Sequence, residues 1–164
     1  MDESAFRRTR EAMTPQPCAF EKAMFAGICA CSLAVRRNIA ERESVACNSA
    51  LAREECAALC ALLRRKSAFA LKLTHVDEPL PHAKEMQVEC GGLQGMQQAA
   101  DPEADDPAAP QERSGQAESR PSVADVHQLV QACAEKFGGI ANLPYSTIVQ
   151  SVVAYQIRRR RQER

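Results

Sequence analysis

The stretch GICACSLAVRRNIAERESVACNSALAREECAALC, residues 27–60, decides how the fold is predicted, because it holds five cysteines in thirty-four residues. Free cysteine is small and often buried, so each thiol could simply pack in a core. A cluster of thiols can also ligate a metal or act in redox chemistry. Apolar side chains recur every three or four residues through this stretch, which is the period of a helix.

Two helices are therefore predicted around these cysteines. The first begins near Pro17 and runs to about Glu41. The second is capped by Asn48 or Ser49 and runs to about Leu73. No alternating run of β-branched residues appears, so no strand is expected. The apolar stripe of the first helix consists of Phe20, Met24, Ile28, Cys31, Val35 and Ile39.

Glycines and prolines place the remaining boundaries. A shorter helix fits residues 82–90, with Gly91-Gly92 as its stop. Ser122 is a suitable cap for a helix that ends at Phe137, before Gly138-Gly139. A last helix begins near Pro144 and leads to a basic tail.

The sequence thus predicts an all-α protein in four parts. Residues 1–16 form a flexible N-terminal arm, and residues 17–96 form a cysteine-rich bundle of about three helices. Residues 97–121 are rich in Pro, Ala, Asp and Glu without apolar period, which predicts a disordered acidic linker. Residues 122–164 form a C-terminal helical hairpin with a basic tail.

Composition narrows the class of protein. The chain has 164 residues, eight cysteines and a formal net charge of zero. Its longest apolar run, Ala23 to Val35, has thirteen residues, which is too short to span a membrane. This run also lacks the features of an export signal, so we expect no membrane association and a cytoplasmic location, where thiols stay reduced.

The cysteines are the candidate metal ligands. Cys56 and Cys60 are one turn apart on a helix face, and Cys47 lies in the loop before that helix. Cys90 precedes a Gly-Gly pair that permits close backbone approach. We expect these four to hold an iron–sulfur cluster or zinc, in a redox, sensing or metal-handling role, although no pair of zinc knuckles is present. Cys29 or Cys31 could replace one of the four.

Two alternatives remain at this point. In the first, the cysteines only pack, and the chain is an interaction or adaptor protein whose partner is another protein. In the second, Cys47 is an activated thiol, and His75 or His82 serves as its base or as a metal ligand. The sequence has no P-loop, no G-x-S-x-G and no H-E-x-x-H, so binding is expected rather than catalysis.

The basic tail suggests a further kind of contact. Four consecutive arginines follow the last predicted helix, and guanidinium groups suit nucleic-acid phosphates. The preceding helical hairpin offers few side chains that could read bases, so any nucleic-acid binding is expected to be weak and non-specific. The four residues are Arg158, Arg159, Arg160 and Arg161.

Overall fold

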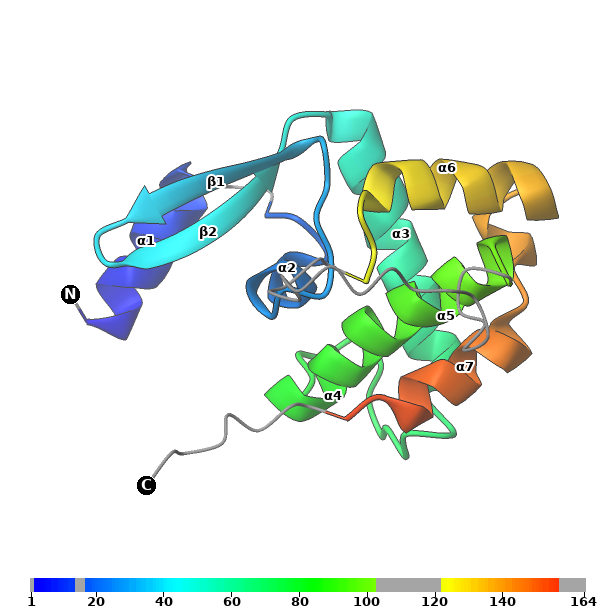
Figure 1. Ribbon diagram of the computed structural model, residues 1–164. Helices are drawn as coiled ribbons and strands as arrows, with labels where there is room; N and C mark the ends of the chain where they lie inside the picture. Colours follow the sequence, from blue (N-terminus) through cyan, green and yellow to red (C-terminus); the bar gives the residue numbers. More distant parts are fainter. Residues whose placement is uncertain (1, 14–16, 103–121, 157–164) are drawn as a thin grey trace, which may run out of the picture.

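The computed structural model describes residues 2–13, 17–102 and 122–156. Helices dominate, and a two-stranded antiparallel sheet lies with α1 at one side of the molecule, away from the longer helices (Figure 1). The elements in chain order are α1 (Glu3–Met13), α2 (Glu21–Phe25), β1 (Ala34–Ile39), β2 (Arg42–Cys47), α3 (Ala50–Ser67), α4 (His82–Met86), the π-helical turn η1 (Gln87–Gly91), α5 (Gly92–Ala100), α6 (Val126–Phe137), the 3-10 turn η2 (Ile140–Asn142) and α7 (Tyr145–Ala154).

The hairpin corrects the all-α prediction for the segment after α2. A single helix from Pro17 to about Glu41 is not formed, because Gly27 takes φ +74° directly after α2 and turns the chain out of the helix. The backbone beyond it then bonds elsewhere: the N–H of Ala30 donates to the carbonyl oxygen of Val123 at 3.0 Å. No local sequence pattern predicts that this segment pairs with a residue as distant along the chain as Val123.

The register of the hairpin pairs Ala34 with Cys47 and Ile39 with Arg42. Its two-residue turn places Ala40 at φ +56°. A positive φ at the first turn position is the geometry of a type II′ turn, which normally carries glycine. The usual sequence signal of a hairpin is therefore missing.

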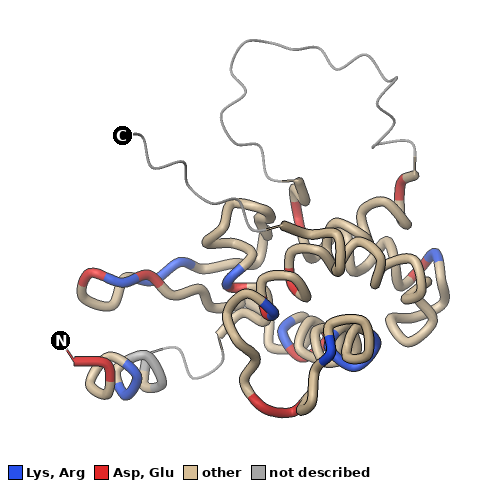
Figure 2. Tube along the Cα trace, turned by 90° about the horizontal axis from the view of Figure 1, so that it is seen from below, with Lys and Arg blue, Asp and Glu red and all other residues tan. Residues whose placement is uncertain are grey.

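Helix α1 packs against this hairpin, where we expected a loose arm. The guanidinium of Arg42 lies 4.5 Å from the ring centroid of Phe6 and pairs with the Glu3 carboxylate at 2.9 Å. Arg36 and Glu43 form a 3.1 Å ion pair across the strands. Basic and acidic residues follow one another along the hairpin (Figure 2), so charge is balanced locally.

Helix α3 confirms the predicted cap. The Ser49 hydroxyl accepts the N–H of Ala52 at 3.2 Å. The helix ends at Ser67, earlier than the predicted Leu73. Leu59 lies fully buried on its inner face.

Gly91 and Gly92 do not stop a helix, contrary to the prediction. Helix α4, η1 and α5 follow without a break, and residues 97–100, predicted as linker, form the last turn of α5. A Cβ at Gly91 would lie 2.6 Å from the Cα of Val152. Glycine at this position therefore lets η1 and α7 pack with their backbones close together.

The C-terminal helices belong to the same core as the cysteine-rich part. Asp125, rather than the predicted Ser122, caps α6 by accepting the His127 N–H at 3.0 Å. Gly138 at φ +79° ends α6 as predicted. Buried residues from both sides of the region 103–121 form one cluster, which includes Phe20, Val45, Leu59, Leu93, Val130 and Ile148.

Candidate functional site: a cavity lined by cysteines

Four cysteines from four separate segments line one small cavity. Cys18 precedes α2, Cys31 lies in the loop before β1, Cys47 ends β2 and Cys56 lies in the second turn of α3. The cavity has a volume of about 20 Å³, which is enough for a group of roughly the size of a water molecule. It is also lined by Ala19, Met24, Leu33, Ala34, Ala46, Ala52, Arg53, Val126 and His127.

Backbone hydrogen bonds hold these segments together. The N–H of Cys18 donates to the carbonyl oxygen of Val45 at 2.8 Å, which ties the start of α2 to β2. The N–H of Val126 donates to the carbonyl oxygen of Ala30 at 2.9 Å, which ties the start of α6 to the loop that carries Cys31. The cavity is therefore built by pairing between segments distant in sequence.

Backbone N–H groups point at two of the sulfurs. The N–H of Phe20 donates to the sulfur of Cys18. The N–H of Leu33 donates to the sulfur of Cys31, while the nearby N–H of His127 donates to Asp125. Donors of this kind favour the thiolate over the thiol and lower the thiol pKa. The backbone donors at Cys18 and Cys31 therefore act to stabilise a thiolate at these two positions.

Burial acts in the opposite direction and is the larger effect. It raises the pKa of Cys18 and of Cys56 to about 12. It also raises the pKa of Cys31, with the Asp125 carboxylate adding to the effect. Without a bound cation these thiols are protonated at neutral pH and are poor nucleophiles. A metal centre would have to displace their protons.

The surroundings of Cys47 do not favour an activated thiol. Its sulfur donates to the carbonyl oxygen of Ser49 at 3.2 Å, an acceptor that stabilises the thiol and not the thiolate. His75 and His82 are exposed and lie outside the cavity lining. His127, which the sequence analysis did not single out, does line it.

Positive groups surround the cavity. The first turns of α3 and α6 contribute lining residues, and a helix N-terminus carries partial positive charge. Arg53 lines the cavity as well, and its Nε is buried without a hydrogen-bond partner in the part of the chain that the structure describes. A buried unpaired donor is costly, and an anionic sulfur in the cavity would satisfy it. The cavity thus has four thiols and one unpaired guanidinium donor in its lining.

The structure brings together three of the six cysteines that the sequence suggested, Cys31, Cys47 and Cys56, and adds Cys18 to them. Within residues 2–13, 17–102 and 122–156, no three His, Cys, Asp or Glu side chains are already arranged to hold a metal ion. The sequence feature that could have identified Cys18 as a cavity residue is a short pattern that it shares with Cys31. Cys18-Ala19-Phe20 and Cys31-Ser32-Leu33 share the order cysteine, small residue, large apolar residue, which places an N–H two positions after each sulfur.

The other three suggested cysteines lie outside the cavity lining. Cys60 is one turn beyond Cys56, and its sulfur accepts a hydrogen bond from Arg64. Cys90 is fully buried in η1, where Tyr155 hydrogen-bonds its sulfur. Cys29 is buried and pairs through its backbone with Val123. Cys29 and Cys90 are therefore packed in the interior, and Cys60 is half-buried against the core.

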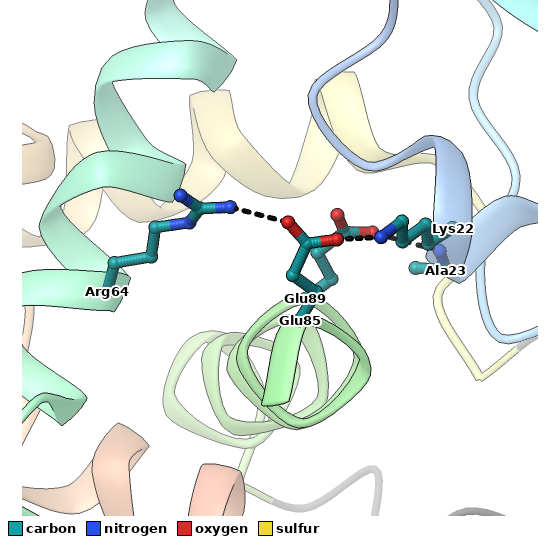
Figure 3. A network of polar contacts seen from close by, with 5 residues as sticks. All are labelled: Lys22, Ala23, Arg64, Glu85 and Glu89. Atoms are coloured by element: carbon teal, nitrogen blue, oxygen red, sulfur yellow. Dashed lines mark hydrogen bonds and ion pairs between the residues drawn. The ribbon is translucent and has the colours of Figure 1, made fainter. Parts of the chain in front are cut away.

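A carboxylate network lies on the side of the cysteines toward α4 and η1. Glu85 bridges Lys22 and Arg64, the latter at 2.9 Å. Glu89 accepts the N–H of Ala23 at 3.0 Å, so both carboxylates face α2 and α3 from the same helical segment (Figure 3). Burial raises the pKa of Glu89 to about 7. The network fixes α2, and with it the segment that carries Cys18.

One remaining prediction concerns residues that the structure does not describe. Arg158, Arg159, Arg160 and Arg161 lie outside the described residues, so phosphate binding by the tail stays a prediction.

Among the described helices, none has the length and apolar character needed to cross a membrane. Comparison with known proteins found no matching family model, no matching curated protein and no matching solved structure.

Proposed function

We propose that this chain binds a metal centre, either a zinc ion or an iron–sulfur cluster, through the thiolates of Cys18, Cys31, Cys47 and Cys56. The observation that carries the proposal is that these four cysteines, from four segments, line one cavity. Iron–sulfur clusters commonly take four thiolate ligands, and the ligands need not be adjacent in sequence.

The size of the cavity bears on the kind of centre. Its volume of about 20 Å³ is that of a single small group, so it suits one zinc ion held by four thiolates. A cluster core is larger, and it would require the four segments to move apart. Metal analysis distinguishes the two.

A redox or sensing role follows from the surroundings of the centre. Hydrogen bonds to sulfur, net charge and burial together set the potential of a cluster. N–H donors at Cys18 and Cys31 supply the first of these, and the largely apolar lining supplies the last. A cluster that exchanges single electrons would require a protein partner.

The decisive experiment is purification of the full chain without oxygen, followed by visible absorption and by analysis for iron, acid-labile sulfide and zinc. We expect either one zinc per chain in a colourless protein, or iron and sulfide in a coloured one. A colourless, metal-free protein in which all eight thiols react with a thiol reagent would refute the proposal.

A matched pair of variants assigns the ligands. Cys56 and Cys60 lie one turn apart on α3, but Cys56 lines the cavity and Cys60 does not. We expect Cys56→Ser to lose the visible absorption and the bound metal, and Cys60→Ser to retain both. Equal loss in the two variants would contradict the proposed ligand set.

A further inference from the structure

Phe69, in the turn that follows α3, is the most exposed large apolar side chain in the part of the chain that the structure describes. It is 97% exposed, and Leu51 follows at 78%. The segment after α3 lies at the lower edge of the molecule in Figure 1, so the ring faces solvent at the surface. A phenylalanine left in water gives up the free energy of burial, and the core of this protein does not use the ring.

Backbone hydrogen bonds hold Phe69 in a defined turn. The N–H of Lys72 donates to the carbonyl oxygen of Phe69 at 3.2 Å, and the N–H of Leu73 donates to that of Ala68 at 2.9 Å. This pair of bonds is a Schellman motif, whose left-handed residue is usually glycine. Lys72 occupies that position at φ +55°. A strained residue of this kind indicates a functional demand on its side chain, which here is a positive charge beside Phe69.

Three exposed cationic side chains flank Phe69. Arg65 and Lys66 precede it by four and three residues, and the helical hydrogen-bond pattern continues beyond Phe69, so both lie on its side of the helix. Lys72 follows it by three residues. Among the described residues, none of these three cations forms an ion pair with a carboxylate. We call Arg65, Lys66, Phe69 and Lys72 the Phe69 surface.

Few acidic groups lie near this surface. Residues 56–76 contain no Asp or Glu, and neither α7 nor η2, which pack against α3, carries a charged residue. The Nζ of Lys66 lies 5.7 Å from the ring centroid of Tyr145 on α7. Glu78 lines a cavity with Lys72, but Lys84 lines it as well, so the region stays positive. A partner of negative charge is therefore favoured.

We infer that the Phe69 surface binds single-stranded nucleic acid, with one base stacked on the Phe69 ring and the adjoining phosphates paired with the three cations. Single-strand sites combine aromatic rings with basic side chains that follow the phosphate backbone. A membrane-bound face or the core of a protein interface needs several apolar side chains in one patch, whereas this turn offers one large exposed ring. The inference goes beyond the proposed metal centre and does not depend on it.

The test measures binding of the full chain to a short fluorescent oligothymidine, to oligouridine, to a DNA duplex of the same length and to vesicles rich in anionic lipid, each over a series of salt concentrations. Phe69→Ala and Phe69→Leu remove the aromatic ring, and Phe69→Tyr keeps it. Leu51→Ala is the matched control, because it removes an exposed apolar side chain from the other end of α3. Melting temperatures should be unchanged in the three Phe69 variants, since the ring is exposed.

We expect the wild type to bind the single-stranded oligomers more tightly than the duplex. Phe69→Ala and Phe69→Leu should bind them about tenfold more weakly, as expected when a base loses its aromatic partner. Phe69→Tyr and Leu51→Ala should match the wild type. Replacing Arg65 and Lys72 together by Gln should weaken binding to all oligomers alike. It should also lower the slope of log Kd against log salt by about 1.4, because each phosphate contact to a single strand contributes about 0.7.

The tail arginines Arg158 to Arg161 could bind phosphates independently, so each measurement is repeated with these four replaced by Gln. The effect of Phe69→Ala should persist in that background. Equal oligomer binding by the wild type and Phe69→Ala, loss of all binding with the tail arginines, or binding to vesicles alone that Phe69→Leu retains would each overturn the inference. No residue of the Phe69 surface lines the cysteine cavity, so these outcomes leave the proposed metal centre to its own test.

Discussion

Two regions of the molecule use cysteine in different ways. Between α5, α6 and α7, Cys133 is fully buried among apolar side chains, and its sulfur lies 3.7 Å from the carbonyl oxygen of Met96. Where the hairpin meets α3 and α6, Cys18 and Cys31 are half-buried and receive backbone N–H donors. In the first region the thiol packs as a small apolar group, and in the second it lies beside backbone donors and a small cavity.

The difference comes from how the backbone is organised. In the helical region nearly every N–H is taken by the helix itself, so none is free to point at a sulfur. Around the cavity the chain is loop, strand end and helix N-terminus, where N–H groups lack helical partners. Backbone N–H donors to sulfur are therefore found at Cys18 and Cys31, where regular structure ends.

The largest expected effect concerns Glu89, which lies where the two regions meet. Burial is the main cause that raises its pKa to about 7 in the folded protein, from an ordinary value of 4.5. The folded state therefore holds this proton more tightly than the unfolded state, and stability falls as the pH rises from about 4.5 to about 7. Such a shift corresponds to on the order of 3 kcal/mol.

We therefore expect Glu89→Gln to be more stable than the wild type at pH values above the folded pKa of Glu89, and to lose this advantage in mild acid. Urea unfolding of the metal-free protein at several pH values measures the difference. Glu43→Gln, at an exposed position in the hairpin, is the control. A wild-type stability that stays flat through this pH range would show that Glu89 is ionised without cost.

A change in the helical region alone should be the next in size. Gly91→Ala places a Cβ at 2.6 Å from the Cα of Val152 and 2.8 Å from the carbonyl oxygen of Ser151, so α7 has to move. We expect a loss of about 2 kcal/mol in the free energy of unfolding, measured by urea unfolding. Gln97→Ala on α5 should change it little. If Gly91→Ala is tolerated as well as Gln97→Ala, the close approach of η1 and α7 is not needed for stability.

Two cysteine substitutions, one in each region, test the difference between the regions directly. Cys133→Ser buries a hydroxyl in an apolar core, so it should lower stability by about 1–2 kcal/mol and leave metal content unchanged. Cys18→Ser should do the reverse, abolishing the bound metal with a small change in the stability of the metal-free protein. Metal analysis and thermal melting of both variants check this. Metal loss in both would mean that the division between the two regions is wrong.

The smallest effect belongs to the hairpin turn. Ala40 has φ +56°, a conformation that costs an alanine about 1 kcal/mol. Ala40→Gly removes this strain but gives the unfolded chain more freedom, so the net gain should be below about 1 kcal/mol. A small rise in melting temperature would confirm it, and Ala57→Gly, in the exposed middle of α3, should lower the melting temperature instead.

The sequence by itself determined those features that depend on neighbouring residues. Ser49 caps α3, and Gly138 ends α6, because capping and the left-handed conformation are local properties. The enrichment of cysteines in residues 18–60 was visible in the same way, and with it the class of chemistry that we propose.

Only the tertiary structure decided which cysteines meet and what the glycine pair does. Cys18 joins the cavity because its N–H bonds to Val45, and the loop that carries Cys31 is held by Ala30 and Val123, a pairing that no short window of sequence can contain. From the sequence, Gly91 is predicted to end a helix. In the folded protein α7 packs against Gly91, and the missing side chain allows close contact between the two backbones. Local propensity is weak beside such contacts, so tertiary bonding and packing overrode it at each of these places.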